Sequence, residues 1–245
     1  MLCPICSEST SLLDVVDFNK SCEELRGKFL PLAGVPIYFR RCDRCFFSFA
    51  PEFWNWSDED FVDKIYNDAY AEVDPDYVEV RPQANAGFLK KILGEQAEFI
   101  RHLDYGGGNG RLSQILKGDG WSSETYDPFP NDPGLIKTIG KFNLITAFEV
   151  FEHVPHVATL MENLTRLMGD GCIVLFSTLI TDGNIKPNER LSWWYASPRN
   201  GHISLFSKKS LYLLGLKHDL NLGSFSQGLH CFYRDVPSWA AHIIK

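Results

Sequence analysis

A glycine-rich segment at residues 103–112, LDYGGGNGRL, has the composition of a turn that binds a ligand. Four of the five residues from 106 to 110 are glycine. Glycine permits sharp turns and lets a ligand approach the backbone where a Cβ atom would collide with it. A helix that follows such a turn offers its first N–H groups to the ligand. The segment therefore predicts a small-molecule site.

The spacing of these glycines indicates which kind of ligand fits. Asp104, Gly106, Gly108 and Gly110 form the pattern D-x-G-x-G-x-G. A dinucleotide-binding G-x-G-x-x-G would require glycine at position 111, where the chain has Arg111. A carboxylate two residues before the first glycine repels a pyrophosphate and attracts an ammonium or sulfonium group. The pattern therefore favours a cationic ligand over a dinucleotide.

Two CxxC pairs near the N-terminus are a second group of residues with chemical potential. CPIC and CDRC supply Cys3, Cys6, Cys42 and Cys45. Four thiolates in two such pairs suit tetrahedral Zn²⁺, whereas the alternative is a redox or disulfide role. A closed four-cysteine site has no open position, so the zinc is expected to support folding. No group of Asp, Glu and His stands out as a catalytic Mg²⁺ site, and we expect no catalytic metal.

The elements that must hold the glycine loop alternate between helix and strand from about residue 84 onward. Apolar spacing predicts helices at 84–95, 111–118, 155–168 and 207–220, and strands at 97–105, 122–127, 142–150 and 171–178. Two further strands flank Gln227 and Gly228. This order predicts an α/β fold, a mostly parallel sheet with helices on both faces and a closing antiparallel hairpin. Such sheets bind ligands at the carboxyl ends of their strands, where the glycine loop lies.

Composition divides the chain into three modules and limits the class of partner. We expect a zinc-binding knuckle module at 1–50, an aromatic helical bridge or lid at 51–83, and the α/β domain at 84–245. The net charge of -7 argues against nucleic acid as a partner and favours a small molecule. No apolar run reaches the roughly 20 residues of a membrane helix, and the N-terminus does not resemble a signal peptide. We therefore expect a cytoplasmic protein without a membrane partner, and the oligomeric state stays open.

Three motifs between residues 98 and 178 together resemble those of the class I S-adenosylmethionine-dependent methyltransferases. They are the glycine loop with its preceding acid, the segment TYDPF, and the segment FNLITAFEVFEHVP. The resemblance implies a Rossmann-like methyltransferase fold that binds S-adenosyl-L-methionine. It also implies that the methionine part of this cofactor is held by Asp104, Gly106, Gly108 and Gly110.

The resemblance also assigns residues to the rest of the cofactor. It implies that Asp127 binds both ribose hydroxyls, a task that suits a carboxylate because it accepts two hydrogen bonds. The alternative for Asp127 is a helix cap or turn former before Pro128. Phe148 and Glu149 are implied at the edge of the cofactor. The short interval between Asp127 and Phe142 contains prolines at 128, 130 and 133, so the third strand usual in this family is expected to be short or missing.

A four-cysteine knuckle, a tyrosine-containing bridge and such a core resemble the bacterial methyltransferases of nucleotide-linked deoxysugars and related secondary metabolites. The segment GHISLFS is similar to the H-x-x-x-F-S of the sugar C-methyltransferases, in which the histidine is the base. His202 is thus the expected general base, with a structural role as the alternative. Because Arg199 and Gly201 replace the tyrosine and acid of those enzymes, methylation of oxygen is favoured over carbon.

These features predict a methyltransferase for a small acceptor, a sugar-linked or anionic metabolite. Two other classes of function remain open on the sequence alone. One is a zinc-knuckle binding module on a catalytically inactive methyltransferase-like shell. The other is an NAD-dependent oxidoreductase, which Asp104 and Arg111 disfavour.

Overall fold

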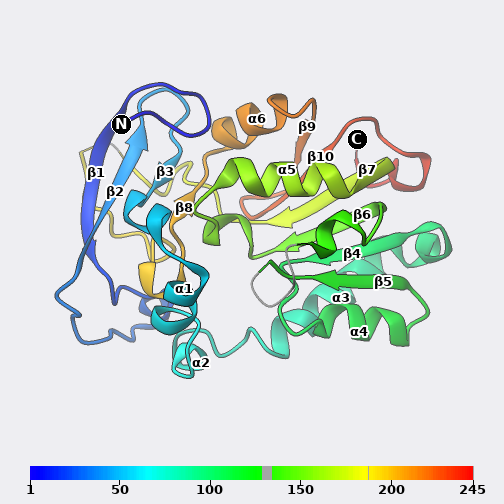
Figure 1. Ribbon diagram of the computed structural model, residues 1–245, viewed down its shortest axis with the longest axis horizontal. Coiled ribbons are helices and arrows are strands. Elements are labelled where there is room, and N and C mark those ends of the chain that lie inside the picture. The colour runs from blue at the N-terminus through cyan, green and yellow to red at the C-terminus, as the bar shows by residue number, and fades with distance from the viewer. Residues whose placement is uncertain (129–133, 187, 245) are drawn as a thin grey trace. The chain divides into compact units, whose positions relative to one another are not determined.

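The protein is described by a computed structural model that covers residues 1–128, 134–186 and 188–244, and it consists of two compact units (Figure 1). Unit 1 comprises Met1–Pro75, Phe151–Ala158 and Thr178–Leu214. Unit 2 comprises Asp76–Val150, Thr159–Ser177 and Gly215–Lys245. Each unit therefore combines segments that are far apart in the sequence. The three module boundaries expected from composition stay a prediction.

Unit 2 contains a six-stranded sheet in the order β5-β4-β6-β7-β10-β9 (Figure 1). Strands β4, β5, β6 and β7 are parallel, and β10 is antiparallel to both β7 and β9. The predicted mostly parallel sheet with a closing antiparallel hairpin is thus confirmed. The strand bounds are Arg101–Tyr105 for β4, Ser122–Tyr126 for β5, Phe142–Phe148 for β6, Met168–Ser177 for β7, Asn221–Ser224 for β9 and Leu229–Tyr233 for β10.

The helices of the α/β pattern also form where apolar spacing predicts them. They are α3 at Val80–Leu93, α4 at Arg111–Gly118, α5 at Val157–Leu167 and α6 at Lys208–Leu216. Helix α6 begins after Ser207, whose Oγ accepts the N–H of Ser210 at 2.9 Å, as expected for an N-cap. Among the described residues, no helix is both long and apolar enough to cross a membrane.

Helices α3 and α4 pack on one face of the sheet in unit 2. Their buried Leu89 and Leu116 belong to the same apolar cluster as Leu144 of β6 and Leu175 of β7. Side chains alternate between the faces of a strand, so the neighbouring Phe176 points to the opposite face. Its ring stacks on Phe232 of β10 with 4.8 Å between ring centroids.

The interval between β5 and β6 is short of regular structure. Its described residues contain a 3-10 helix at Leu135–Lys137 and no strand. This agrees with the expectation of a short or missing third strand. Of the three prolines that prompted it, those at 130 and 133 lie outside the described residues.

Unit 1 contains an antiparallel sheet in the order β1-β2-β3-β8. The strands are β1 at Thr10–Asp17, β2 at Pro36–Cys42, β3 at Ser48–Phe49 and β8 at Ser204–Leu205. Two short helices, α1 at Asp58–Lys64 and α2 at Tyr70–Val73, follow the third strand. Strand β8 comes from the long loop after β7, so this loop is a structural part of unit 1. Buried Phe39, Phe53, Ile65 and Leu205 share its apolar core.

We expect Leu144→Ala to lower the free energy of unfolding by about 3 kcal/mol, because it leaves a cavity under α3 and α4. Urea unfolding followed by circular dichroism measures the change. Leu216→Ala, whose side chain is 49% exposed, is the matched control and should cost less than about 1 kcal/mol. Equal losses in the two variants would contradict the assignment of Leu144 to the core.

Candidate functional site

The glycine loop lies at the carboxyl end of β4, between the ends of β5 and β6. Gly106, Gly108 and Gly110 have φ angles of 73°, 53° and 75°, in the left-handed region that glycine adopts without steric cost. A Cβ atom on Gly106 would lie 2.5 Å from Cγ2 of Val150, just after β6. The spacing of glycines in the sequence thus reflects backbone conformation and close contact with the next strand.

Asp127 connects the end of β5 to the glycine loop. The backbone N–H of Gly108 donates to Oδ2 of Asp127 at 2.8 Å, and the aspartate is 9% exposed. A Cβ atom on Gly108 would meet nothing within 4 Å, so the loop faces open space at this position. The structure thus brings together two residues that the sequence assigned to different parts of one ligand. Their roles in binding that ligand stay a prediction.

Asp104 is buried beneath the loop at the end of β4. It is 5% exposed, and the hydroxyl of Thr146 donates to its Oδ1 at 3.0 Å. Burial raises the pKa of Asp104 to about 7, a shift that the Thr146 hydrogen bond opposes and the charge of Asp127 reinforces. A cation bound nearby would favour the ionised form of this carboxyl.

His102 supports Asp104 through Thr146 and was not singled out from the sequence. Its Nδ1 lies 2.7 Å from Oγ of Ser123, and its Nε2 lies 2.9 Å from Oγ1 of Thr146. Complete burial lowers the pKa of His102 to about 3, so the ring is neutral. The signal in the sequence was the placement of His102 two residues before Asp104, because alternate residues of a strand lie on the same face.

Glu149 follows β6 and has a strained backbone. Its φ of 53° is unusual for a residue with a side chain and costs on the order of 1 kcal/mol. The N–H of Glu149 donates to Oγ of Ser177 at 2.8 Å, and this hydroxyl donates back to Oε1 of Glu149 at 2.8 Å. Nη1 of Arg81 lies 3.9 Å from Oε2. Phe148 precedes it at the end of β6 and is half-buried.

His202 lies in a polar cluster within unit 1. Its Nδ1 is 2.9 Å from the carbonyl oxygen of Tyr195, and its ring packs edge-on against His153 with 4.8 Å between centroids. The hydroxyl of Tyr66 lies 3.1 Å from Nδ1 of His153. The hydroxyl of Tyr195 donates to Oε1 of Glu152, a side chain with no exposed surface. Tyr66 and Tyr195 thus contact the cluster through their hydroxyl groups.

Two hydrogen bonds to backbone carbonyl oxygens hold the two segments of this cluster together. The N–H of Ile203 donates to the carbonyl oxygen of Glu152 at 2.9 Å, and Oγ of Ser204 donates to that of Val154 at 2.7 Å. Gly201 has a φ of 82°, and a Cβ atom there would lie 3.0 Å from Nδ1 of His153. Glycine in GHISLFS is therefore required by the approach of the two histidine segments.

Arg199 is buried near this cluster and is used in packing. Its Nη1 donates to the carbonyl oxygen of Ile65 at 2.9 Å, and its Nη2 contacts Oδ1 of Asn67 at 3.4 Å. Burial lowers the pKa of its guanidinium. These contacts link the long loop to the end of α1 and give Arg199 a positioning role within unit 1.

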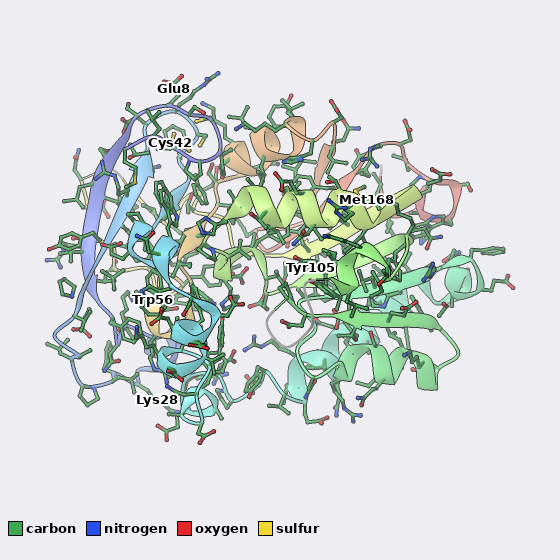
Figure 2. The ribbon with its side chains drawn as sticks, viewed as in Figure 1. Glu8, Lys28, Cys42, Trp56, Tyr105 and Met168 are labelled. Atoms are coloured by element: carbon green, nitrogen blue, oxygen red, sulfur yellow. The ribbon has the colours of Figure 1, made fainter. Side chains whose placement is uncertain are left out.

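The four cysteines of the CxxC pairs converge in unit 1. Sγ of Cys3 lies 3.6 Å from Sγ of Cys45, and Sγ of Cys6 lies 3.4 Å from Sγ of Cys42, which is labelled in Figure 2. All four sulfur atoms lie within 4.8 Å of one another. The edges of a Zn²⁺–thiolate tetrahedron with 2.3 Å bonds measure about 3.8 Å. The hydrogen bond between Cys3 and Cys45 lowers the pKa of Cys3 and raises the pKa of Cys45, as expected when one thiolate accepts the proton of a neighbouring thiol.

Comparison with known protein families identifies the family to which this chain belongs. Residues 77–224 match the family model described as a methyltransferase domain. The match covers more than half of the chain and includes the glycine loop, β5 and β6, so the protein belongs to this family. It is a methyltransferase, and the oxidoreductase alternative is not supported. No curated protein matches the chain.

Several solved structures are similar to the chain at low identity. An O-methyltransferase family protein from Burkholderia thailandensis has a TM-score of 0.44 and 13% identity, covering 77% of this chain and 71% of that one. An O-methyltransferase family 2 protein from Planctomyces limnophilus, in complex with apigenin, has a TM-score of 0.44 and 13% identity. The similarity covers 71% of this chain and 65% of that one. Magnesium protoporphyrin IX methyltransferase from Synechocystis, with bound SAH, has a TM-score of 0.41 and 13% identity. The similarity covers 74% of this chain and 95% of that one.

The raised pKa of Asp104 predicts a pH-dependent stability. Its ordinary value is 3.8, so between about pH 4 and pH 7 the unfolded chain has released a proton that the folded chain keeps. The free energy of unfolding from this group therefore falls as the pH rises to about 7. Asp104→Asn cannot ionise and should be more stable than the parent at pH 8, by up to about 4 kcal/mol.

Urea unfolding of both proteins at pH 4.5 and pH 8 measures this difference. The stability of the variant relative to the parent should be greater at pH 8 than at pH 4.5, because most of the effect develops between these two pH values. A difference between the two proteins that is the same at both pH values would contradict a raised pKa of Asp104.

Proposed function

We propose that the protein transfers a methyl group from S-adenosyl-L-methionine to an oxygen atom of a small acceptor, a sugar-linked or anionic metabolite. The observation that carries the proposal is the glycine loop, with Asp127 bonded to Gly108 and Asp104 buried beneath it. The loop provides close backbone approach, and the two carboxyls provide complementary charge for a cationic cofactor. The match to a methyltransferase domain over the same segment supports it.

In this proposal different residues around the loop bind different parts of the cofactor. Asp104, Gly106, Gly108 and Gly110 hold the methionine part, and Asp127 accepts hydrogen bonds from the ribose hydroxyls through its carboxylate. Phe148 and Glu149 line the edge of the cofactor. The strained φ of Glu149 supports a functional role for this position, because such strain is kept where the surrounding structure fixes it.

His202 is the proposed general base that removes the proton from the acceptor hydroxyl. In the transfer, an O–CH₃ bond forms as the S–CH₃ bond breaks, and an acceptor hydroxyl must lose its proton. A carbonyl oxygen only accepts hydrogen bonds, so the contact with Tyr195 fixes the proton on Nδ1 of His202. The lone pair of a neutral His202 is then on Nε2 and can take the proton.

The four cysteines are the proposed site of a structural zinc ion. Their sulfur separations fit a tetrahedron, and Cys3, Cys42 and Cys45 are buried. All four ligand positions are filled by thiolates, so the ion would support the fold of unit 1 and leave no place for an acceptor.

Binding of S-adenosylmethionine, measured by calorimetric titration, tests the cofactor assignment. We expect saturable binding with a Kd in the micromolar range, and none of NADH. Gly108→Ala should weaken binding tenfold or more, because its methyl group would occupy the open space that the loop faces.

Gly120→Ala is the matched control for the glycine loop. Gly120 has a φ of 85° and open space around its Cβ position, so both variants pay a similar conformational cost of about 1 kcal/mol. The control should bind the cofactor as the parent does. Absence of binding to the parent, or equal binding by both variants, would sink the assignment.

Metal analysis tests the zinc assignment. A thiol-modifying mercurial should release one zinc ion per chain from the parent, and Cys42→Ser should lose this ion together with much of the stability of unit 1. Cys231→Ala, a buried cysteine in unit 2, should retain it. Release of no zinc from the parent would exclude the site.

A further inference from the structure

A second group of potential metal ligands lies in unit 1, apart from the four cysteines in the sequence. The ligand atoms of Glu152, His153 and His202 lie within 4.8 Å of one another. We call these three residues the Glu-His-His cluster. Glu152 has no exposed surface, and His202 is 5% exposed. The three side chains come from two segments that the fold joins by the contact between Ile203 and Glu152.

Outer hydrogen bonds determine which atoms of the cluster can bind an ion. Nδ1 of His202 donates to the carbonyl oxygen of Tyr195, which leaves the lone pair on Nε2. The hydroxyl of Tyr66 engages Nδ1 of His153, and the hydroxyl of Tyr195 donates to Oε1 of Glu152. Metal-binding histidines and carboxylates characteristically have such second hydrogen bonds, which fix the ring orientation and the tautomer.

The chemistry of the cluster also fits a cation. Glu152 has no exposed surface, and a buried carboxylate is stabilised by coordination to a cation. Two nitrogen ligands and one carboxylate are a donor set for Zn²⁺, Mn²⁺, Fe²⁺ or Co²⁺, with coordination positions left open. With bonds of about 2.1 Å the ligand atoms would lie about 3.4 Å apart, so closing on an ion requires side-chain movements on the order of 1 Å.

We propose that Glu152, His153 and His202 bind a divalent transition-metal ion. The ion would lower the pKa of an acceptor hydroxyl that coordinates it, and would favour an acceptor with two neighbouring oxygen atoms. This consequence rests on the proposed methyl transfer. Nε2 of His202 cannot bind an ion and accept a proton at once, so with the ion bound His202 acts as a ligand and the acceptor proton passes to solvent.

Titration with Co²⁺, followed by visible absorption, tests the site directly. The protein is used in full length with zinc in the four-cysteine site. One equivalent of Co²⁺ should bind and give d–d bands without the thiolate-to-cobalt band that would report exchange at the cysteines. The measurement needs neither cofactor nor acceptor. A failure of metal binding is therefore distinct from a failure of cofactor binding in the calorimetric titration.

Variants of the cluster identify the ligands. Glu152→Gln keeps an oxygen for the Tyr195 hydroxyl and should weaken Co²⁺ binding tenfold or more, as should His153→Gln. His156→Ala is the matched control, because this exposed histidine contacts only a backbone carbonyl oxygen in the described contacts. Circular dichroism and the content of cysteine-bound zinc report folding. Absence of stoichiometric Co²⁺ binding to the parent, or equal affinity in all variants, would overturn the proposal.

Discussion

The close approach of the glycine loop to the neighbouring strand ends is the constraint on which the proposed cofactor site of unit 2 depends. Gly106 stands where a Cβ would overlap Val150, and a Cβ on Gly107 would lie 2.3 Å from Oδ2 of Asp104. The loop can therefore fold over Asp104 only because these positions lack side chains. That approach also places the N–H of Gly108 within hydrogen-bonding distance of Asp127. The loop after β4 thus contacts residues that lie just after β5 and β6.

Burial of charge beneath this loop is a cost that the surrounding polar groups reduce. Thr146 donates to Asp104, and His102 holds Thr146 in that orientation with its own neutral ring. The carboxyl nevertheless keeps a pKa near 7, because the loop excludes water and Asp127 adds a like charge. A cationic ligand would relieve both effects. The burial of Asp104 beside the charge of Asp127 therefore favours a ligand of positive charge.

Unit 1 also buries polar side chains, and other polar groups contact them there. The buried carboxylate of Glu152 and the rings of His153 and His202 are held by tyrosine hydroxyls and a backbone carbonyl oxygen. The four cysteines of unit 1, which come from the N-terminal part of the chain, form a second cluster. Both clusters combine residues from separate segments. The sheet that joins β8 to β3 is what makes the long loop after β7 part of the same unit.

Much of the fold and half of the candidate site could be predicted from local sequence. Helix and strand positions in unit 2 follow from apolar periodicity, and the glycines and CxxC pairs have spacings that backbone conformation and metal geometry impose on nearby residues. The sequence alone therefore determined the α/β class, the loop and the cysteine site. Contacts between distant segments were not predictable in this way. His102 beneath Asp104, Tyr195 on Glu152, and His202 beside His153 were decided by tertiary structure, because only packing sets which side chains meet and which charges are buried.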